Sequence, residues 1–182
     1  MGKIRNLHRI NHMLSRKHRI NLYLAIVSPQ FDYGDVLWGG CNQKESISLQ
    51  RIQNFAMKSI LGKRKRYSTR KCMQDLKFLS LEQRRHIHYS VFLHKALLGK
   101  SSSNLQKQIS SYIPKIRTRN TANRKLIIPA HSTAKFRKSP LYKMISAWNE
   151  SPSHLPKDSI QLHKKHYQKY LIQQTYPDNP SI

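Results

Sequence analysis

Acidic side chains are scarce in this chain of 182 residues. Eight Asp and Glu stand against 34 Lys and Arg, which gives a formal net charge of +26. No carboxylate lies between Glu82 and Glu150, although many Lys and Arg do. Mutual repulsion of this size disfavours a compact state, and a polyanion relieves it through the release of counterions. The composition therefore predicts a nucleic-acid partner and indicates no reaction.

Cysteines and long apolar runs are also few. Cys41 and Cys72 lie far apart without a Cys-x-x-Cys spacing, so we expect neither a disulfide framework nor a zinc knuckle. A reducing compartment, nuclear or cytoplasmic, is the simpler setting. The longest apolar run, 22–27, is much shorter than the ~20 residues that cross a bilayer, so no membrane association is expected.

Motifs that mark an active site are missing. The chain has no GxGxxG, GxxxxGK[ST] or GxSxG pattern. Asp32 and Asp35 invite comparison with the aspartates that hold two magnesium ions in polymerases. Their spacing differs from the adjacent pair of a reverse transcriptase palm, and no third carboxylate follows nearby. We therefore interpret them as carboxylates at a helix end near Lys and Arg, and we expect the chain alone to be no enzyme.

Two histidine pairs have the spacing of one helical turn. His8 precedes His12, and His163 precedes His166, but no Cys, Asp or Glu nearby completes a zinc shell. We expect these side chains to add solvated positive charge at mildly acid pH. No metal and no cofactor are predicted.

Apolar spacings predict helices over most of the chain. The first 27 residues fit two basic helices or one broken helix, with Ser15 as a cap and Pro29 as the end. The aromatic segment 31–40 predicts a short helix packed against its predecessor. Further helices are expected over 49–60, from Ser68 to Leu76, from the Ser80 capping box to near Gly99, over 105–113, from Ser139 to Trp148, and from Asp158 or Ser159 to about 172.

The predicted fold is all-α, a basic helical bundle with a loop or extended segment before two C-terminal helices. Residues 126–128 are apolar enough to anchor a strand-like piece of that segment. We expect a helical region over 1–100, a basic linker over 101–138, a C-terminal helical pair over 139–174 and a tail over 175–182. Trp38 and Trp148 lie in apolar helical patterns and are predicted to be core residues.

Basic clusters interleaved with a ring are the strongest functional signal. Arg offers a planar fork to phosphate, Lys a mobile charge, and Tyr a face on which an unpaired base can stack. A merely solvated loop, or a run of the nuclear-localisation kind, is the alternative interpretation. The candidate nucleic-acid-binding residues are Lys63, Arg64, Lys65, Arg66, Tyr67, Arg70 and Lys71, followed by Lys115, Arg117, Arg119, Arg124 and Lys125.

A family resemblance is carried by LYLAIVSPQFDYGDVLWGG (22–40) and ISLQRIQNFAMKSILG (47–62). It continues in LKFLSLEQRR (76–85), in TRN (118–120) and in SAWNESPSHLP (146–156), which is a stretched form of a Trp-Asn-x-Leu-Pro signature. The segment SIQLHKKHYQKYL (159–171) has His163 where the pattern usually has Phe. Together these motifs resemble the region after the palm in reverse transcriptases of jockey-like non-LTR retrotransposons.

The resemblance implies an all-helical thumb and C-terminal extension that grips template RNA or an RNA–DNA hybrid beside the palm. The palm's catalytic aspartates and the family's endonuclease would lie upstream of this segment. The expected function is therefore that of a non-catalytic, nucleic-acid-binding C-terminal fragment of an RNA-directed DNA polymerase, with the palm of the same element as a further partner. The alternative is a free-standing basic structural or assembly protein that binds rRNA or an acidic partner.

Overall fold

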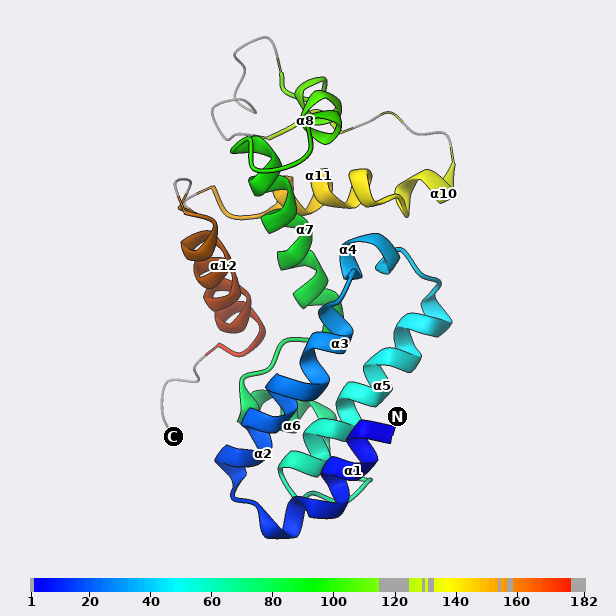
Figure 1. Cartoon of the computed structure of the whole chain (residues 1–182), viewed down its shortest axis with the longest axis vertical. Coiled ribbons are helices and arrows are strands. Elements are labelled where there is room, and N and C mark those ends of the chain that lie inside the picture. The colour runs from blue at the N-terminus through cyan, green and yellow to red at the C-terminus, as the bar shows by residue number, and fades with distance from the viewer. Residues whose placement is uncertain are drawn as a thin grey trace.

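The computed structural model describes residues 2–114, 125–128, 130, 133–153, 155–156 and 159–177. Every regular element among these residues is helical, which confirms the all-α prediction. The molecule is elongated, with α7 (Leu81–Leu97) running along its long axis (Figure 1). No helix in the described part of the chain is both long enough and apolar enough to cross a membrane.

The N-terminal elements are α1 (Gly2–Ile10), η1 (Asn11–Met13), α2 (Arg16–Leu22), η2 (Tyr23–Val27) and α3 (Ser28–Asp32). As predicted, Ser15 caps α2, since its side chain accepts a hydrogen bond from the His18 amide. The prediction that Pro29 ends the helix is wrong, because Pro29 lies in the first turn of α3. The five residues of η2 form a π-helical stretch directly before it, and this wider turn accommodates a ring that lacks an amide hydrogen and would crowd a regular helix.

Next come α4 (Asp35–Trp38), α5 (Gln43–Ile60), α6 (Thr69–Leu76) and α7. The short helix α4 exists as predicted, but it packs on α7 rather than on its predecessor. Ser68 caps α6, and Ser80 forms the predicted capping box with Gln83. The glycines that close α5 and α7, Gly62 and Gly99, both have positive φ, as a helix stop requires.

The C-terminal elements are α8 (Ser103–Ser110), α10 (Ala134–Arg137), α11 (Pro140–Glu150) and α12 (Ile160–Thr175). Ser139 and Ser159 cap α11 and α12 as expected, whereas α10 was not predicted. The extended residues 125–128 are fixed by Asn149 of α11. Its amide donates to the Leu126 carbonyl at 2.9 Å and accepts from the Leu126 amide at 2.8 Å, as a neighbouring strand would.

Three buried clusters hold these helices, and α7 contributes to each of them. The first joins Ile4, Tyr23, Val27, Phe31, Ala56, Ile60 and Leu81. The second joins Tyr89, Leu93, Ala96, Ile109, Leu126, Met144, Ile145 and Ala147. The third joins Leu79, Ile87, Val91, Leu155 and Tyr167. The two tryptophans are only half-buried: the Trp148 ring stacks on His163, and the Trp38 ring is covered by Arg85.

Candidate nucleic-acid interface

A groove of about 900 Å³ runs where α1, the middle of α5 and the loop 61–68 meet. We call it the basic groove. Its lining residues are His8, Arg51, Asn54, Phe55, Lys58, Ser59, Lys63, Arg64, Lys65 and Thr69. Five of them are Lys or Arg and none carries a carboxylate, so its surface attracts anions.

Hydrogen bonds from the first helical segment shape the groove. His8 Nδ1 lies 2.9 Å from Ser59 Oγ, and the Asn11 side chain donates to the Ser59 carbonyl at 2.7 Å. The loop is held from α5 by Lys58, whose ammonium group donates to the Lys65 carbonyl at 2.7 Å. These hydrogen bonds fix the positions of Ser59 and of the loop backbone at Lys65, whereas much of the remaining lining consists of long basic side chains.

An aromatic pair lies inside the basic groove. The rings of His8 and Phe55 are 5.6 Å apart at 54°, and Phe55 is 40% exposed. An exposed ring among cations is the arrangement on which single-stranded nucleic acids stack their bases. Tyr67, not Phe55, is the ring that the sequence predicts for stacking, because the helical spacing of Phe55 resembles that of a core residue. Only the tertiary contact between α1 and α5 brings the two rings together.

The first predicted cluster is largely surface. Lys63, Arg64, Lys65, Arg66, Arg70 and Lys71 are all exposed, and the first three line the basic groove. Tyr67 is half-buried, and Lys63 Nζ lies 5.0 Å from its ring centroid, so one face of this ring is already occupied. Phe55 is therefore the better platform for a base.

The second predicted cluster is only partly within the described chain. Lys115, Arg117, Arg119 and Arg124 lie outside the described residues. Lys125 is exposed and precedes Leu126, which packs with α8 and α11 at the end of the molecule opposite to α1 and α6 (Figure 1). Lys125 is therefore not part of the basic groove.

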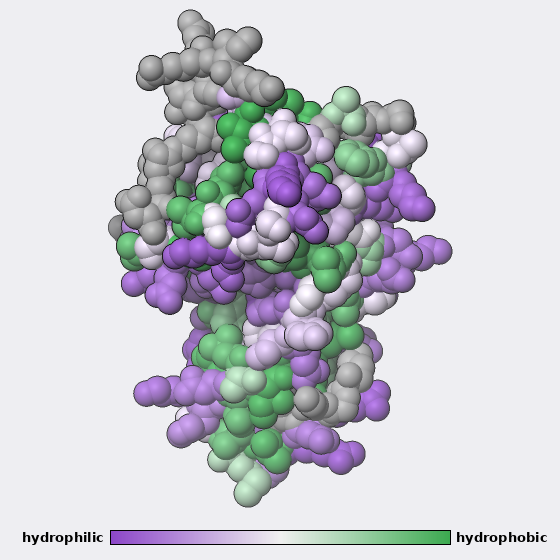
Figure 2. Space-filling model, turned by 45° about the horizontal axis from the view of Figure 1, so that its top comes forward, coloured by the Kyte–Doolittle hydropathy of each residue, from purple (hydrophilic) through white to green (hydrophobic). Residues whose placement is uncertain are grey.

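Very little of the positive charge is neutralised within the fold. Arg84 is the one Lys or Arg among the described residues that forms an ion pair, and its partner is Asp32. Figure 2 shows hydrophilic side chains projecting from both flanks of the molecule, with apolar surface between them near its lower end. Exposed, unpaired cations retain their full attraction for phosphate.

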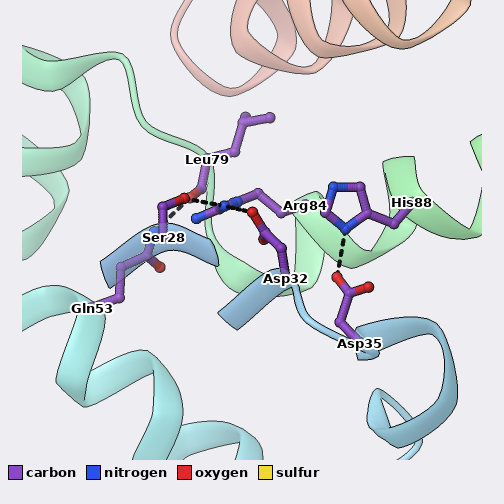
Figure 3. Close-up of polar contacts among 7 residues, drawn as sticks. All are labelled: Ser28, Asp32, Asp35, Gln53, Leu79, Arg84 and His88. Carbon is purple, nitrogen blue, oxygen red and sulfur yellow. Dashed lines mark hydrogen bonds and ion pairs between the residues drawn. The ribbon is translucent and has the colours of Figure 1, made fainter. Parts of the chain in front are cut away.

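The two aspartates discussed above lie in a polar cluster at the junction of α3, α4 and α7 (Figure 3). Arg84 binds Asp32 and also donates to Ser28 Oγ at 2.5 Å, while His88 Nδ1 lies 2.5 Å from Asp35 Oδ2. Ligand atoms of Asp32, Asp35 and His88 lie within 4.8 Å of one another, a set that could hold a cation. Because Arg84 and His88 already engage both carboxylates, the cluster fits the interpretation of paired helix-end carboxylates.

The expectation of a solvated His163 is wrong. This side chain is 2% exposed, its Nε2 lies 3.0 Å from Ser90 Oγ, and its ring stacks on Trp148 at 5.6 Å and 18°. Burial, assisted by the neighbouring His94, lowers the pKa of His163 to about 4. It is therefore uncharged in the core at neutral pH. His8, His12 and His166 are exposed as expected.

The buried thiol also has no reactive character. Cys72 is fully buried in α6, and desolvation raises its pKa, so the nucleophilic thiolate is disfavoured.

No protein-family model matches the chain, and the curated proteins and solved structures give no match either. Its function must therefore be argued from its own residues.

Proposed function

We propose that the chain binds RNA or an RNA–DNA hybrid through the basic groove, as the non-catalytic C-terminal part of a non-LTR retrotransposon RNA-directed DNA polymerase. The observation that carries the binding proposal is the exposed Phe55 among five cations with no carboxylate in the groove. The polymerase assignment is supported by the order of the sequence motifs described above.

Two kinds of contact divide the work of binding. Lys63, Arg64 and Lys65 pair with phosphates, which supplies affinity without sequence preference. Phe55, backed by His8, stacks on an unpaired base, which favours single-stranded or frayed regions over a continuous duplex. Neither contact moves a proton or breaks a bond. The chain therefore increases the affinity for the template, and nucleotide addition is carried out by a palm domain.

Fluorescence anisotropy with a short single-stranded RNA tests this proposal. Each phosphate contact contributes about 0.7 to the slope of log K against log salt, so neutralising three contacts should lower the slope by about 2. We expect this reduction in the variant Lys63→Gln/Arg64→Gln/Lys65→Gln. The matched control, Lys164→Gln/Lys165→Gln/Lys169→Gln, removes three exposed charges from α12 and should keep a steeper slope. Equal slopes for the two variants would exclude the groove.

Stacking is tested separately by Phe55→Leu. Loss of one stacked base weakens binding by ~1–3 kcal/mol, which is roughly a fivefold to hundredfold increase in Kd. Phe92→Leu is the control, because Phe92 is 39% exposed on α7 and does not line the groove.

Tighter binding to an acidic peptide than to RNA would favour the free-standing assembly protein instead.

Primer extension addresses the polymerase assignment. The chain alone should give no synthesis with magnesium or manganese, because nucleotide addition needs carboxylates that converge on two metals. Added to a palm fragment of a matching element, it should raise processivity, and the groove variant should not. Synthesis by the purified chain, or a palm fragment that gains nothing, would overturn this part of the proposal.

A further inference from the structure

A second cavity, of about 710 Å³, lies between the α4–α5 connection, α7 and α11, away from the basic groove. Its most unusual lining residue is Arg85, which is only 6% exposed. The guanidinium carbon lies 4.7 Å from the Trp38 ring centroid, so one face of the cation is covered by indole. A buried arginine normally pairs with a carboxylate, and Arg85 has none within 4.0 Å among the described residues.

The hydrogen-bonding capacity of Arg85 is mostly unused. Its Nη1 donates to Ser46 Oγ at a long 3.3 Å, and its Nε and Nη2 have no partner in the described structure. The neighbouring Tyr89 hydroxyl is buried without a partner as well, and burial together with the charge of Asp35 raises the pKa of Tyr89 to about 12. The Tyr89 hydroxyl therefore remains a hydrogen-bond donor at neutral pH, and the guanidinium of Arg85 can act only as a donor. Unpaired buried donors are rare in folded proteins and call for an explanation.

The charge around the cavity favours an anion. Arg137, Lys138 and Lys143 join Arg85 in the lining, against Glu82 and Glu150. Glu150 is already engaged, because its carboxylate accepts from Ser146 Oγ at 2.7 Å and lies 2.8 Å from His86 Nε2. The lining therefore has four cations against one carboxylate, Glu82, for which the described part of the chain supplies no such partner.

The connection that closes the cavity is built for close approach. A Cβ on Gly40 would lie 2.3 Å from the Lys138 carbonyl oxygen, and one on Gly39 would lie 2.5 Å from the Tyr89 hydroxyl. Only glycine lets this turn touch both α7 and the C-terminal end of α10, at Lys138. Lys138 and Arg85 are thereby held on the same cavity although they lie more than fifty positions apart in the sequence.

We infer that this cavity is a discrete phosphate-binding site in which Arg85 is the buried anchor and Lys138 and Lys143 supply the rim. The guanidinium fork pairs with two oxygens of one phosphate, a geometry that a lone carbonyl or hydroxyl cannot satisfy. The site is independent of the basic groove, so it would give the chain a preference for a particular phosphate group in addition to general polyanion attraction.

Thermal unfolding with inorganic phosphate tests the site. A chain of this charge responds to any anion, so ionic strength is matched with sodium chloride. At roughly ten times Kd, phosphate should raise the Tm by about 3–6 °C. Arg85→Met keeps an unbranched side chain over Trp38, should have at least the wild-type Tm without phosphate, and should lose the phosphate response. An unchanged response in Arg85→Met, or no response in the wild type, would overturn the proposal.

Further variants keep the test decisive. Lys143→Gln should weaken phosphate binding several-fold, whereas Lys164→Gln, an exposed α12 residue outside the cavity, should not. If Arg85→Met does not fold, this pair decides in its place, and equal effects would refute the site. An equal Tm rise with acetate would mean a carboxylate site and also contradict the proposal.

The source of the phosphate is resolved by comparing inorganic phosphate, adenosine 5′-monophosphate and an RNA 10-mer with or without a 5′-phosphate. Tighter binding of the monophosphate, and of the phosphorylated RNA, assigns the site to a nucleotide end. Equal binding of both RNAs assigns it to the internal backbone, and inorganic phosphate alone assigns it to the free ion. The groove variant Lys63→Gln/Arg64→Gln/Lys65→Gln should retain the Tm response to phosphate even where it loses RNA, so the two proposals can fail separately.

Discussion

The burial of His163 predicts a contribution to stability that is lost in mild acid. In the folded chain its pKa is about 4, against 6.5 for a free histidine. Between these values the unfolded chain binds a proton that the folded chain does not, so the free energy of unfolding falls as the pH falls from 6.5 towards 4. Above 6.5 both states are neutral at this site, and the contribution no longer changes with pH.

The size of the effect follows from the same two values. Protonation of the unfolded histidine at pH 4.5 should lower the free energy of unfolding by about 2 kcal/mol relative to pH 7. The groups that face the ring are Ser90 and His94 of α7, Trp148 of α11, Tyr167 of its own helix, and the backbone of Pro156, whose hydrogen bond partly opposes the lowering of the pKa. None of these is a carboxylate that could stabilise an imidazolium.

Urea denaturation at several pH values between 7 and 4.5 is the assay. His163→Phe alone would strand the buried Ser90 hydroxyl, so the informative variant is Ser90→Ala/His163→Phe, which removes both partners of the hydrogen bond. It should lose about 2 kcal/mol of the wild-type pH dependence, whereas the exposed neighbour variant His166→Gln should keep it. A double variant with the wild-type slope would show that the acid sensitivity arises elsewhere.

Three further substitutions test the packing. Asn149→Ala should cost ~1–3 kcal/mol because it leaves both polar groups of Leu126 unpaired, and hydrogen exchange at the Leu126 amide should accelerate. Gly40→Ala should lower the Tm sharply, because the new Cβ would clash with the Lys138 carbonyl oxygen. An unchanged Tm would show that the turn can shift to accommodate the methyl group. Ser80→Ala should cost about 1 kcal/mol in urea denaturation through loss of the α7 cap, and no change would mean that the cap hydrogen bond is replaced by water.

Helix starts were predicted accurately where a capping serine was identified, whereas α5 begins at Gln43, six positions before the predicted start at 49. Ser15, Ser68, Ser80, Ser139 and Ser159 all cap the helices assigned to them, because a capping hydrogen bond reaches only two or three residues along the chain. The Pro29 prediction failed for the opposite reason. A proline is compatible with a continuous helical path when the preceding turn widens, and no local pattern announces that widening.

The candidate sites depended on contacts that sequence spacing does not reveal. Phe55 meets His8 across 47 positions, and the adjacent residues Arg84 and Arg85 have opposite environments. Arg84 has a carboxylate partner, whereas Arg85 is buried without one. Likewise, α12 is polar enough on all sides that its pattern did not distinguish the buried His163 from the exposed His166. The basic loop was predictable because charge density alone identifies it.

The placement of the few acidic residues explains how so basic a chain can fold and still bind polyanions. Three contacts between a carboxylate and a basic side chain occur among the described residues, and all involve α7: Arg84 pairs with Asp32, His86 contacts Glu150 and His88 contacts Asp35. These contacts join α7 to α3, α11 and α4, so the carboxylates act where helices pack. The basic groove lies outside this set, and none of its Lys or Arg residues forms an ion pair with a carboxylate of the described chain. A carboxylate introduced there, as in Asn54→Asp, should therefore weaken RNA binding without disturbing the pairs that hold α7. A free energy of unfolding that fell as much as the free energy of RNA binding would contradict this separation.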